Sequence, residues 1–441
     1  MKTSTTSIAS IRKVALASFV GTTIEWYDFF LYGTASALVF GKLFFPNYDP
    51  LMGTLASFGT YAVGFIARPI GGIVCGHYGD RIGRKSMLIF TLLLMGVATA
   101  LIGCLPTYEQ IGIWAPILLI ILRLAQGFAV GGEWGGAVLM AVEHAPSSRR
   151  GFYGSWPQIG VPAGLLLSTV IFGQIAKLPE PALLSWGWRI AFLLSILLVA
   201  VGLFIRLAVV EPPIFNEIKQ AGAAARLPVL DTIRQHPKNL LLAMGARVAD
   251  NASFYIYTVF ILTYATTPQI GFARSTVLNA VSLAAVIQVF ALPVFGLLSD
   301  FMGRRPVYLF GALFSAAFAF PFFWLIERAQ TFWLLAAMVI ALAIGHASMY
   351  GPQASFFSEL FGTRVRYTGA SLGYQLSSVL AGGLSPLIAT DLLRRTGRSW
   401  PIALYIVGMA LVTAISVFLA GETAHREITS GVKLATEEPV N

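Results

Sequence analysis

Hydrophobic residues occupy this chain in long runs, and short polar or charged segments separate one run from the next. A helix that crosses a lipid bilayer needs about 20 consecutive, mostly apolar residues. The pattern therefore predicts membrane-spanning helices wherever a run reaches that length. Twelve such runs are present, at residues 14–40, 52–78, 86–105, 114–141, 153–176, 188–209, 240–266, 275–298, 306–326, 331–356, 367–392 and 401–420.

Composition agrees with a membrane protein and excludes an ordinary soluble one. Hydrophobic residues make up 56% of the 441 positions and charged residues only 11%, whereas a soluble domain carries about 25% charged residues. The net charge of +10 does not indicate a nucleic-acid partner, because the basic residues lie in short clusters between apolar runs. That distribution is typical of loops facing the anionic surface of a bilayer.

The loops alternate in charge along the chain. One set of loops, together with both termini, holds 18 Lys and Arg residues, and the other set holds 7. Because basic loops stay on the cytoplasmic side, both termini and the central loop are expected inside the cell. One external loop opposes this bias with Arg394, Arg395 and Arg398.

The chain also repeats itself. The segment at 76–85 (GHYGDRIGRK) recurs 220 residues later at 296–305 (GLLSDFMGRR), after the second run of each half. We therefore predict an all-α integral membrane protein whose twelve transmembrane helices form two six-helix pseudo-symmetric halves. The expected parts are an N-terminal half 1–209, a cytoplasmic loop 210–239, a C-terminal half 240–424 and a short cytoplasmic tail 425–441.

The repeated segment resembles the loop signature of the major facilitator superfamily, and residues 123–127 (RLAQG) resemble that superfamily's fourth-span motif. Four further segments resemble the metabolite:proton symporter family, nearest its shikimate-transporting branch. They are 21–29 (GTTIEWYDF), 67–72 (ARPIGG), 131–136 (GGEWGG) and 185–189 (SWGWR).

The resemblance implies a secondary active transporter rather than an enzyme. It implies a monomer in the inner membrane that takes up a small organic acid by alternating access. Its coupling ion would be a proton, and no other cofactor is expected. Two alternatives stay open, which are a proline- or betaine-type zwitterion:proton symporter and a drug exporter.

The repeated loop is interpreted as a gate. Its glycines permit a tight turn, and its acidic and basic residues can pair with helix ends and hold the cytoplasmic side shut. In the second copy Phe301 replaces an arginine, which predicts a weaker latch there. The residues assigned to this gate are Gly76, Asp80, Arg81, Gly83, Arg84, Lys85, Asp300, Gly303, Arg304 and Arg305.

Charged residues inside the spans carry the functional hypothesis. A charge at the bilayer centre costs at least about 2.5–3.5 kcal/mol, so it faces a partner or a wet cavity. In related proton-linked sugar carriers an aspartate of the first span faces the fourth-span arginine, and Asp28 and Arg123 match those positions. Separating such a pair changes how tightly the acid holds a proton. The alternatives are a permanent ion pair, or Glu25 as the proton site, while Glu133 could serve a gate or the structure.

Arg68 is the candidate anion ligand, because its guanidinium fork suits a carboxylate bidentately. It could equally pin helix ends together. Arg247 and Asp250 lie three apart and could simply pair with each other. No metal-ligand cluster is apparent, so no metal site is expected. Further candidates for binding a ring, hydroxyl or carboxylate are Tyr32, Trp134, Gln158, Asn251, Tyr255, His346 and Gln375.

Overall fold

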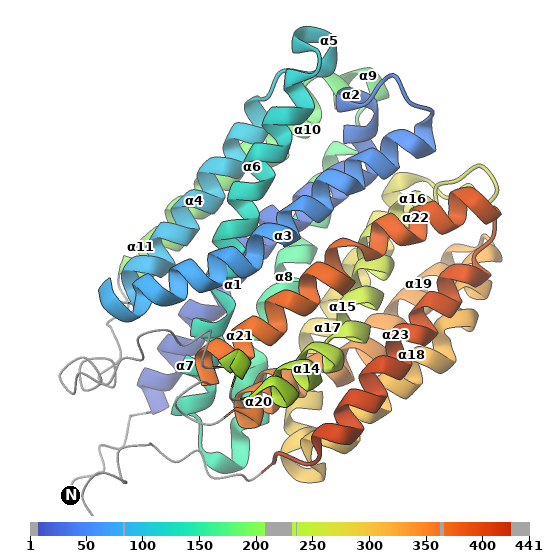
Figure 1. Cartoon of the computed structure of the whole chain (residues 1–441). Coiled ribbons are helices and arrows are strands. Elements are labelled where there is room, and N and C mark those ends of the chain that lie inside the picture. The colour runs from blue at the N-terminus through green and yellow to red at the C-terminus, as the bar shows by residue number, and fades with distance from the viewer. Residues whose placement is uncertain (1–7, 83, 208–231, 235, 362–365, 425–441) are drawn as a thin grey trace, which may run out of the picture.

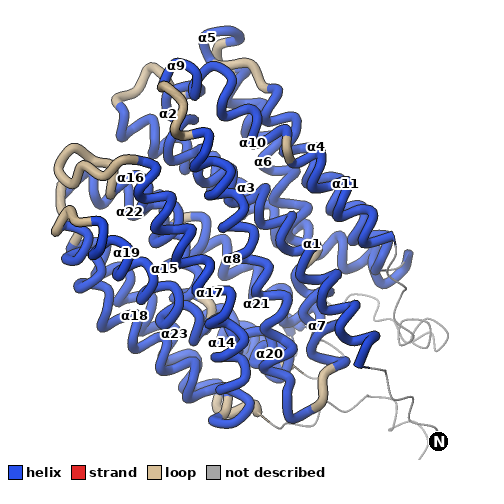
Figure 2. Tube along the Cα trace, turned by 180° about the vertical axis from the view of Figure 1, so that it is seen from behind, coloured by secondary structure: helices blue, strands red, loops and turns tan. Residues whose placement is uncertain are grey.

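The computed structural model describes residues 8–82, 84–207, 232–234, 236–361 and 366–424. Over these ranges the chain is helical apart from short connections, and no β-strand is present (Figure 2). The predicted all-α class is confirmed.

Each apolar run of the first half becomes a helix or a short series of stacked helical segments (Figure 1). Short segments lie in its connections, namely α2 (Gly41–Phe44), α5 (Tyr108–Ile111) and η2 (Ser147–Arg149). The main segments are α1 (Ile8–Ala35) with η1 (Ser36–Phe40), α3 (Pro50–Ile82), α4 (Arg84–Cys104), α6 (Trp114–Gly131) with α7 (Trp134–His144), α8 (Arg150–Ile175), and α9 (Glu180–Ala182) with η3 (Leu183–Gly187), α10 (Trp188–Leu193) and α11 (Ser195–Leu207).

The second half follows the same plan. Three of its spans contain a π-helical turn, and two others run unbroken with an internal proline. The segments are α14 (Pro237–Ala246), α15 (Val248–Tyr255), η4 (Ile256–Phe260) and α16 (Ile261–Tyr264), then α17 (Arg274–Met302), α18 (Arg304–Glu327), α19 (Thr331–Ile340) with η5 (Ala341–His346) and α20 (Ala347–Leu360), α21 (Arg366–Ser377) with η6 (Ser378–Gly383) and α22 (Ser385–Thr396), and α23 (Trp400–Ala420).

Nine helical stretches within the described ranges are long and apolar enough to cross a membrane. All nine fall on predicted runs, and α1, α4 and the stretch from α14 to α16 cover the other three. Large apolar side chains face outward on these helices, and Leu241, Phe290 and Phe204 are 65%, 69% and 77% exposed. Exposed apolar surface of this extent is typical of helices that face lipid.

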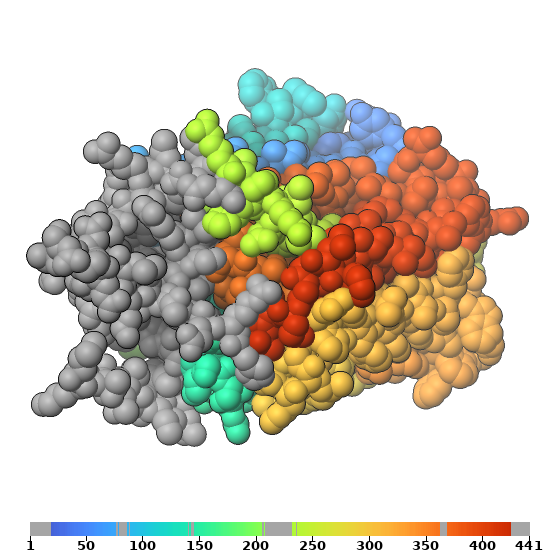
Figure 3. All heavy atoms as spheres, turned by 60° about the horizontal axis from the view of Figure 1, so that its bottom comes forward, coloured from blue at the N-terminus to red at the C-terminus, as the bar shows by residue number. Residues whose placement is uncertain are grey.

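The two halves lie side by side and pack along their long helices (Figure 1). Helix α8 of the first half packs against α17 and α20 of the second, and α3 packs against α21 and α22. At one end of the bundle the start of α8 lies beside the α17–α18 loop and the end of α23 (teal, gold and red in Figure 3). We call this end the latch face.

Candidate functional site

Two arginines lie fully buried among aromatic rings at the centre of the bundle. The guanidinium carbon of Arg68, on α3, lies 4.1 Å from the ring centre of Phe29, 4.2 Å from that of Phe65 and 5.3 Å from that of Trp26. None of its three side-chain nitrogens forms a hydrogen bond of normal geometry with a residue that the structure describes, and its polar neighbour is the Tyr255 hydroxyl. This guanidinium is therefore held by ring contacts, and its hydrogen-bonding capacity is left for another group.

Close backbone packing places Arg68 there. A Cβ atom at Gly127 of α6 would overlap the carbonyl oxygen of Gly64, and one at Gly131 would overlap that of Arg68 itself. Only glycine lets α3 and α6 approach this closely. The four-residue spacing of Gly127 and Gly131 on α6 thus sets the depth at which α3 holds the Arg68 side chain.

Arg123 faces the other part of the same aromatic cluster. Its guanidinium carbon lies 4.2, 4.3 and 4.6 Å from the ring centres of Phe29, Tyr32 and Tyr61. Its Nη1 donates to Gln126 Oε1 at 2.9 Å, whereas Nε and Nη2 find no acceptor within the described ranges. Tyr32, a predicted candidate, therefore does lie at the site, beside Arg123.

Asp28 is fully buried, and neither carboxylate oxygen forms a hydrogen bond of normal geometry with a described residue. Its polar neighbour is the Thr99 hydroxyl, which in turn accepts a 2.7 Å hydrogen bond from Gln126 Nε2. No ion pair joins Asp28 to Arg123 in the described structure, because the guanidinium is turned toward the rings. The two are connected through Gln126 and Thr99, and their direct pairing stays a prediction for another state.

The second half contributes Tyr255 and Asn251 from α15. The Tyr255 ring packs edge-on against Phe65 at 5.2 Å between centres and against Tyr61 at 6.0 Å, and Tyr255 interacts electrostatically with Arg68. Asn251 Nδ2 is buried without an acceptor among the described residues. These two candidates reach the contact between the halves, so a ligand held there would touch both.

Arg247 and Asp250 form an ion pair of 3.0 Å that Gln353 completes. Gln353 accepts from Arg247 at 2.5 Å and donates to Asp250 at 3.0 Å. The same guanidinium carbon lies 3.2 Å from the Tyr374 ring centre. Since its polar groups are satisfied, this cluster favours the structural interpretation of the pair.

His346 also has a local partner. Its Nδ1 lies 2.6 Å from Gln288 Nε2, and its ring packs on Phe254 at 4.6 Å between centres. It packs between α15, α17 and η5, and no described contact joins it to Arg68 or Arg123.

Three further candidates lie together at a closure between the halves rather than at the arginines. Trp134 stacks on Tyr374 with 3.7 Å between ring centres and donates to Gln158 Oε1 at 3.1 Å. Gln158 donates to the Tyr350 carbonyl oxygen at 3.4 Å, and Gln375 donates to that of Gly131 at 3.2 Å. These contacts join α7 and α8 to α20 and α21, toward the latch face.

The second copy of the repeated loop forms the latch itself. Asp300 accepts from the backbone nitrogens of Gly151 at 2.7 Å and Phe152 at 2.9 Å, at the start of α8 in the other half. Arg304 pairs with Asp300 at 2.6 Å and with Glu359 at 3.2 Å. Phe301 is 78% exposed. The ion pair of the latch is made by Arg304 and not by position 301. Phenylalanine at position 301, in place of the arginine of the first copy, therefore leaves this ion pair intact.

Glu422, just after α23, strengthens the same latch and was not anticipated from the sequence. Its carboxylate accepts from the backbone nitrogens of Arg304 at 2.9 Å and Arg305 at 3.2 Å, beside Gly303 with φ of +96°. Neighbouring Thr423 donates to Glu359 at 2.8 Å. An acidic residue that stabilises the start of a helix can be recognised in a sequence only when it lies next to that helix. Glu422 is 118 residues away from Arg304, so the sequence gives no sign of this contact.

The first copy of the loop is only partly visible. Gly83 lies outside the described residues, and so do the side chains of the other five predicted positions. Those positions are Gly76, Asp80, Arg81, Arg84 and Lys85, whose backbone is helical.

Comparison with known proteins identifies the family. Residues 13–239 match the family described as "Sugar (and other) transporter", and residues 240–438 match "Major Facilitator Superfamily". The chain belongs to the major facilitator superfamily. Its relatives include the shikimate transporter of Escherichia coli (strain K12), which is 44% identical over 94% of this chain and 95% of that one.

Two further relatives are less similar in sequence. The inner membrane metabolite transport protein YhjE of the same strain is 39% identical over 96% of this chain and 97% of its own, and the proline/betaine transporter is 33% identical over 97% and 87%. Among solved structures, the partially occluded inward-open xylose transporter XylE from E. coli has a TM-score of 0.73 over 95% of this chain and all of that one, at 19% identity. A D-xylose-proton symporter structure has a TM-score of 0.72 over 94% and 98%, at 18% identity. The predicted twelve-helix fold is confirmed, and the chain is a membrane transporter rather than an enzyme.

Proposed function

We propose that this transporter takes up a small organic acid together with a proton, by alternating access in the inner membrane. The supporting observation is Arg68, a fully buried guanidinium whose nitrogens form no hydrogen bond of normal geometry with a described residue. An uncompensated buried charge is costly, so a site that retains one is suited to an anionic ligand that enters and leaves. The aromatic surroundings of Arg68 suit the ring of a shikimate-like acid. The 44% identical relative is named as a shikimate transporter, which supports the same substrate class.

A zwitterion such as proline or betaine is the second candidate, because 33% identical relatives are named for those solutes. A quaternary ammonium prefers the faces of aromatic rings. Here guanidinium groups already lie over Phe29 from two helices. That arrangement repels a second cation and favours a plain anion.

We further propose that the latch face is cytoplasmic, that both termini lie inside the cell, and that the transporter acts as a monomer. Reporter fusions test the orientation. Fusions at Pro46 and Asn47 should behave as external, and fusions within 215–235 as cytoplasmic. The reverse result at either place would reject the topology.

Substrate and coupling can be tested together in membrane vesicles. Labelled shikimate, a dicarboxylate, citrate, an aromatic acid, proline and betaine are offered with an imposed inward proton gradient. We expect uphill accumulation of one of the acids and its collapse on adding an uncoupler. Accumulation that survives the uncoupler, or that needs sodium, would exclude proton symport. Accumulation of betaine alone would favour the second candidate.

A further inference from the structure

A polar group of the second half meets the Arg68 guanidinium, which belongs to the first half. It is the hydroxyl of Tyr255, the last residue of α15. The Tyr255 ring is 2% exposed and packs edge-on against Phe65, at 5.2 Å between ring centres, and against Phe29, at 6.2 Å. These are the same two rings that contact the guanidinium of Arg68. Tyr255 therefore lies beside Arg68 through its ring and its hydroxyl together.

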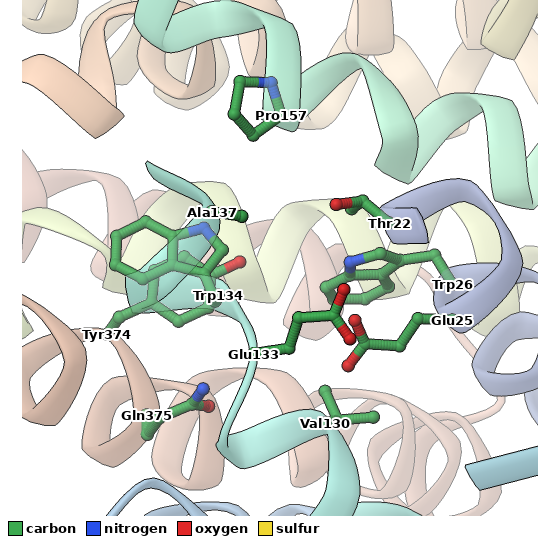
Figure 4. A pocket seen from close by; sticks show the side chains of 10 residues that line it. All are labelled: Thr22, Glu25, Trp26, Val130, Glu133, Trp134, Ala137, Pro157, Tyr374 and Gln375. Atoms are coloured by element: carbon green, nitrogen blue, oxygen red, sulfur yellow. The ribbon is translucent and has the colours of Figure 1, made fainter. Parts of the chain in front are cut away.

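Trp26 covers another side of the guanidinium, with its ring centre 5.3 Å away. The same tryptophan lines a small pocket where α1, α7, α8 and α21 meet, and Glu25 and Glu133 line that pocket as well (Figure 4). No side chain in the lining of this pocket forms a hydrogen bond of normal geometry with Arg68. Among the described residues, Tyr255 is therefore the polar group that an acid arriving at Arg68 would meet.

The contact between the Tyr255 hydroxyl and Arg68 is weaker than the bond that an acid can form there. The hydroxyl is neutral, and the Arg68 nitrogens form no hydrogen bond of normal geometry within the described ranges. A carboxylate forms charge-assisted hydrogen bonds to a guanidinium and can form two of them at once. The displaced hydroxyl also has a second partner at hand. Its other polar neighbour is the hydroxyl of Tyr61 on α3, which likewise lacks a hydrogen bond of normal geometry to a described residue.

The Tyr255 ring is too closely packed to turn away without its helix. A Cβ atom at Gly382 of η6 would lie 2.8 Å from Phe65 Cε1 and 3.0 Å from Tyr255 Cε2, so the glycine leaves no spare room around these rings. Helix α15 is eight residues long, follows α14 at Arg247 and is continued by the π-helical turn η4 from Ile256. Helices bend at π-helical turns and at interruptions of this kind. Displacement of the hydroxyl is therefore expected to move α15.

We infer that the Tyr255 hydroxyl occupies the place of a substrate oxygen at Arg68, and that a bound carboxylate displaces it and frees α15 to move relative to the first half. Tyr255 is then a positioning residue, through which the second half responds to an acid held by the first. This inference rests on the proposed function in taking Arg68 as the anion site. It adds that the transported acid itself releases a contact that joins the two halves in the empty site.

The first test needs no transported substrate. Tyr255→Phe removes the hydroxyl and keeps the ring. Purified full-length protein in liposomes is treated with phenylglyoxal, which condenses with guanidinium nitrogens, and mass spectrometry follows the reaction at Arg68. We expect Arg68 to react about two- to tenfold faster in Tyr255→Phe, the range that corresponds to the loss of one hydrogen bond.

Tyr257→Phe is the matched control, because it removes another buried tyrosine hydroxyl two positions further along the same span. The Tyr257 ring packs on Phe322 at 4.3 Å between ring centres, and no described contact joins it to Arg68 or Arg123. Its reaction at Arg68 should keep the wild-type rate. Acceleration in both variants would mean that any loosening of this span exposes Arg68, and the inference would be rejected.

Transport kinetics distinguish a hydroxyl that competes with the acid from one that binds it. Without the competitor, KM for the acid that accumulates in vesicles should fall about two- to tenfold in Tyr255→Phe. A hydroxyl that bound the acid would make KM rise on its removal, and a merely structural hydroxyl would leave KM unchanged. Tyr61→Phe is a second, independent variant. It deprives the displaced hydroxyl of its other partner, so it should raise KM about twofold or more.

The outcomes separate this inference from the proposed function. An equal rate of reaction at Arg68 in the wild type and in Tyr255→Phe would overturn the inference, even if proton-driven uptake of an acid is found. A KM that rises or stays constant in Tyr255→Phe would overturn it as well. Faster reaction at Arg68 in that variant alone, in a transporter that accumulates no acid, would support the contact between Tyr255 and Arg68 and reject the proposed function.

Discussion

At the residue scale, the site is defined by which buried polar groups have partners and which do not. Arg247 shares its charge with Asp250 and Gln353, so it is satisfied without a ligand. Arg68 has rings around it and forms no hydrogen bond of normal geometry with a described residue. Identical side chains at comparable depth thus have different roles, and the difference lies in their neighbours.

Arg68→Lys separates charge from geometry. Lysine keeps the positive charge but cannot bind both carboxylate oxygens through a planar fork. A hydrogen bond to a charged group contributes about 1.5–3 kcal/mol, so we expect KM for the transported acid to rise about tenfold or more. Initial uptake rates over a series of substrate concentrations give this KM. Arg328→Lys is the control, since Arg328 also packs on rings, Trp324 and Trp333, but at an exposed helix end. An unchanged KM in Arg68→Lys would transfer the anion site to Arg123.

Asp28→Asn tests the coupling residue. Asparagine preserves size and hydrogen bonding but removes the titratable group, so we expect uphill accumulation to be lost. Counterflow, which needs no net proton movement, should persist. Both are measured in the same vesicles. Normal uphill transport would refute the assignment and turn attention to Glu25. Thr99→Val is a useful companion, because it removes the hydroxyl beside Asp28 and leaves the acid in place.

At the element scale, the close contact of α3 with α6 sets the depth of the site. Gly127→Ala would drive a Cβ into the Gly64 carbonyl oxygen. Overpacking of this kind costs about 1–3 kcal/mol, so we expect a lower midpoint of thermal unfolding in detergent. Gly408→Ala on α23 is the control, because its Cβ would meet nothing within 4 Å. A helical glycine costs about 0.5–1 kcal/mol relative to alanine, so this control should be neutral or slightly stabilising. Equal midpoints for the two variants would contradict the close contact.

The helices were predictable and their irregularities were not. Runs of about 20 apolar residues reveal spans, because only a helix satisfies its backbone within lipid. The break at Gly132 and Glu133 carries no such signal, since glycines also mark close helix contacts. Yet this break is what directs Glu133 into the pocket. Likewise Arg68 and Asp28 were identifiable as buried charges, but their lack of mutual pairing depends on ring positions that no spacing encodes.

At the scale of the whole molecule, the structure is closed around its charged centre. Asp28, Arg68 and Arg123 are all fully buried. Toward the latch face the halves meet through the Trp134–Tyr374 stack and then through Asp300 at the start of α8. The sequence predicted the loop of Asp300 as a gate through its repeat, but Glu359 and Glu422 were missed because their partner Arg304 lies more than fifty residues away.

Asp300→Asn should loosen this closed state. The Asp300 carboxylate binds two backbone nitrogens of the other half and Arg304 of its own. Asparagine keeps one acceptor oxygen but loses the charge, and hydrogen bonds involving a charged group contribute about 1.5–3 kcal/mol. Ser155, fully buried beside Gly296, is the reporter position once changed to cysteine in a background without Cys75 and Cys104. We expect a membrane-impermeant maleimide applied at the latch face to label it at least about tenfold faster in Asp300→Asn, since about 1.5 kcal/mol already corresponds to about tenfold in population.

Arg305→Gln is the matched control for this experiment, because it also removes a charge from the same loop. The Arg305 guanidinium lies over Phe418 of its own half, at 4.3 Å from the ring centre, and makes no described contact with the first half. Its backbone nitrogen still donates to Glu422 after the substitution. Labelling should therefore stay at the parental rate. Equal acceleration in both variants would mean that loop charge in general, and not the Asp300 contact with α8, holds the halves together. No acceleration in either would place the closing free energy in the aromatic stack, which Trp134→Ala in the same cysteine background would then reveal.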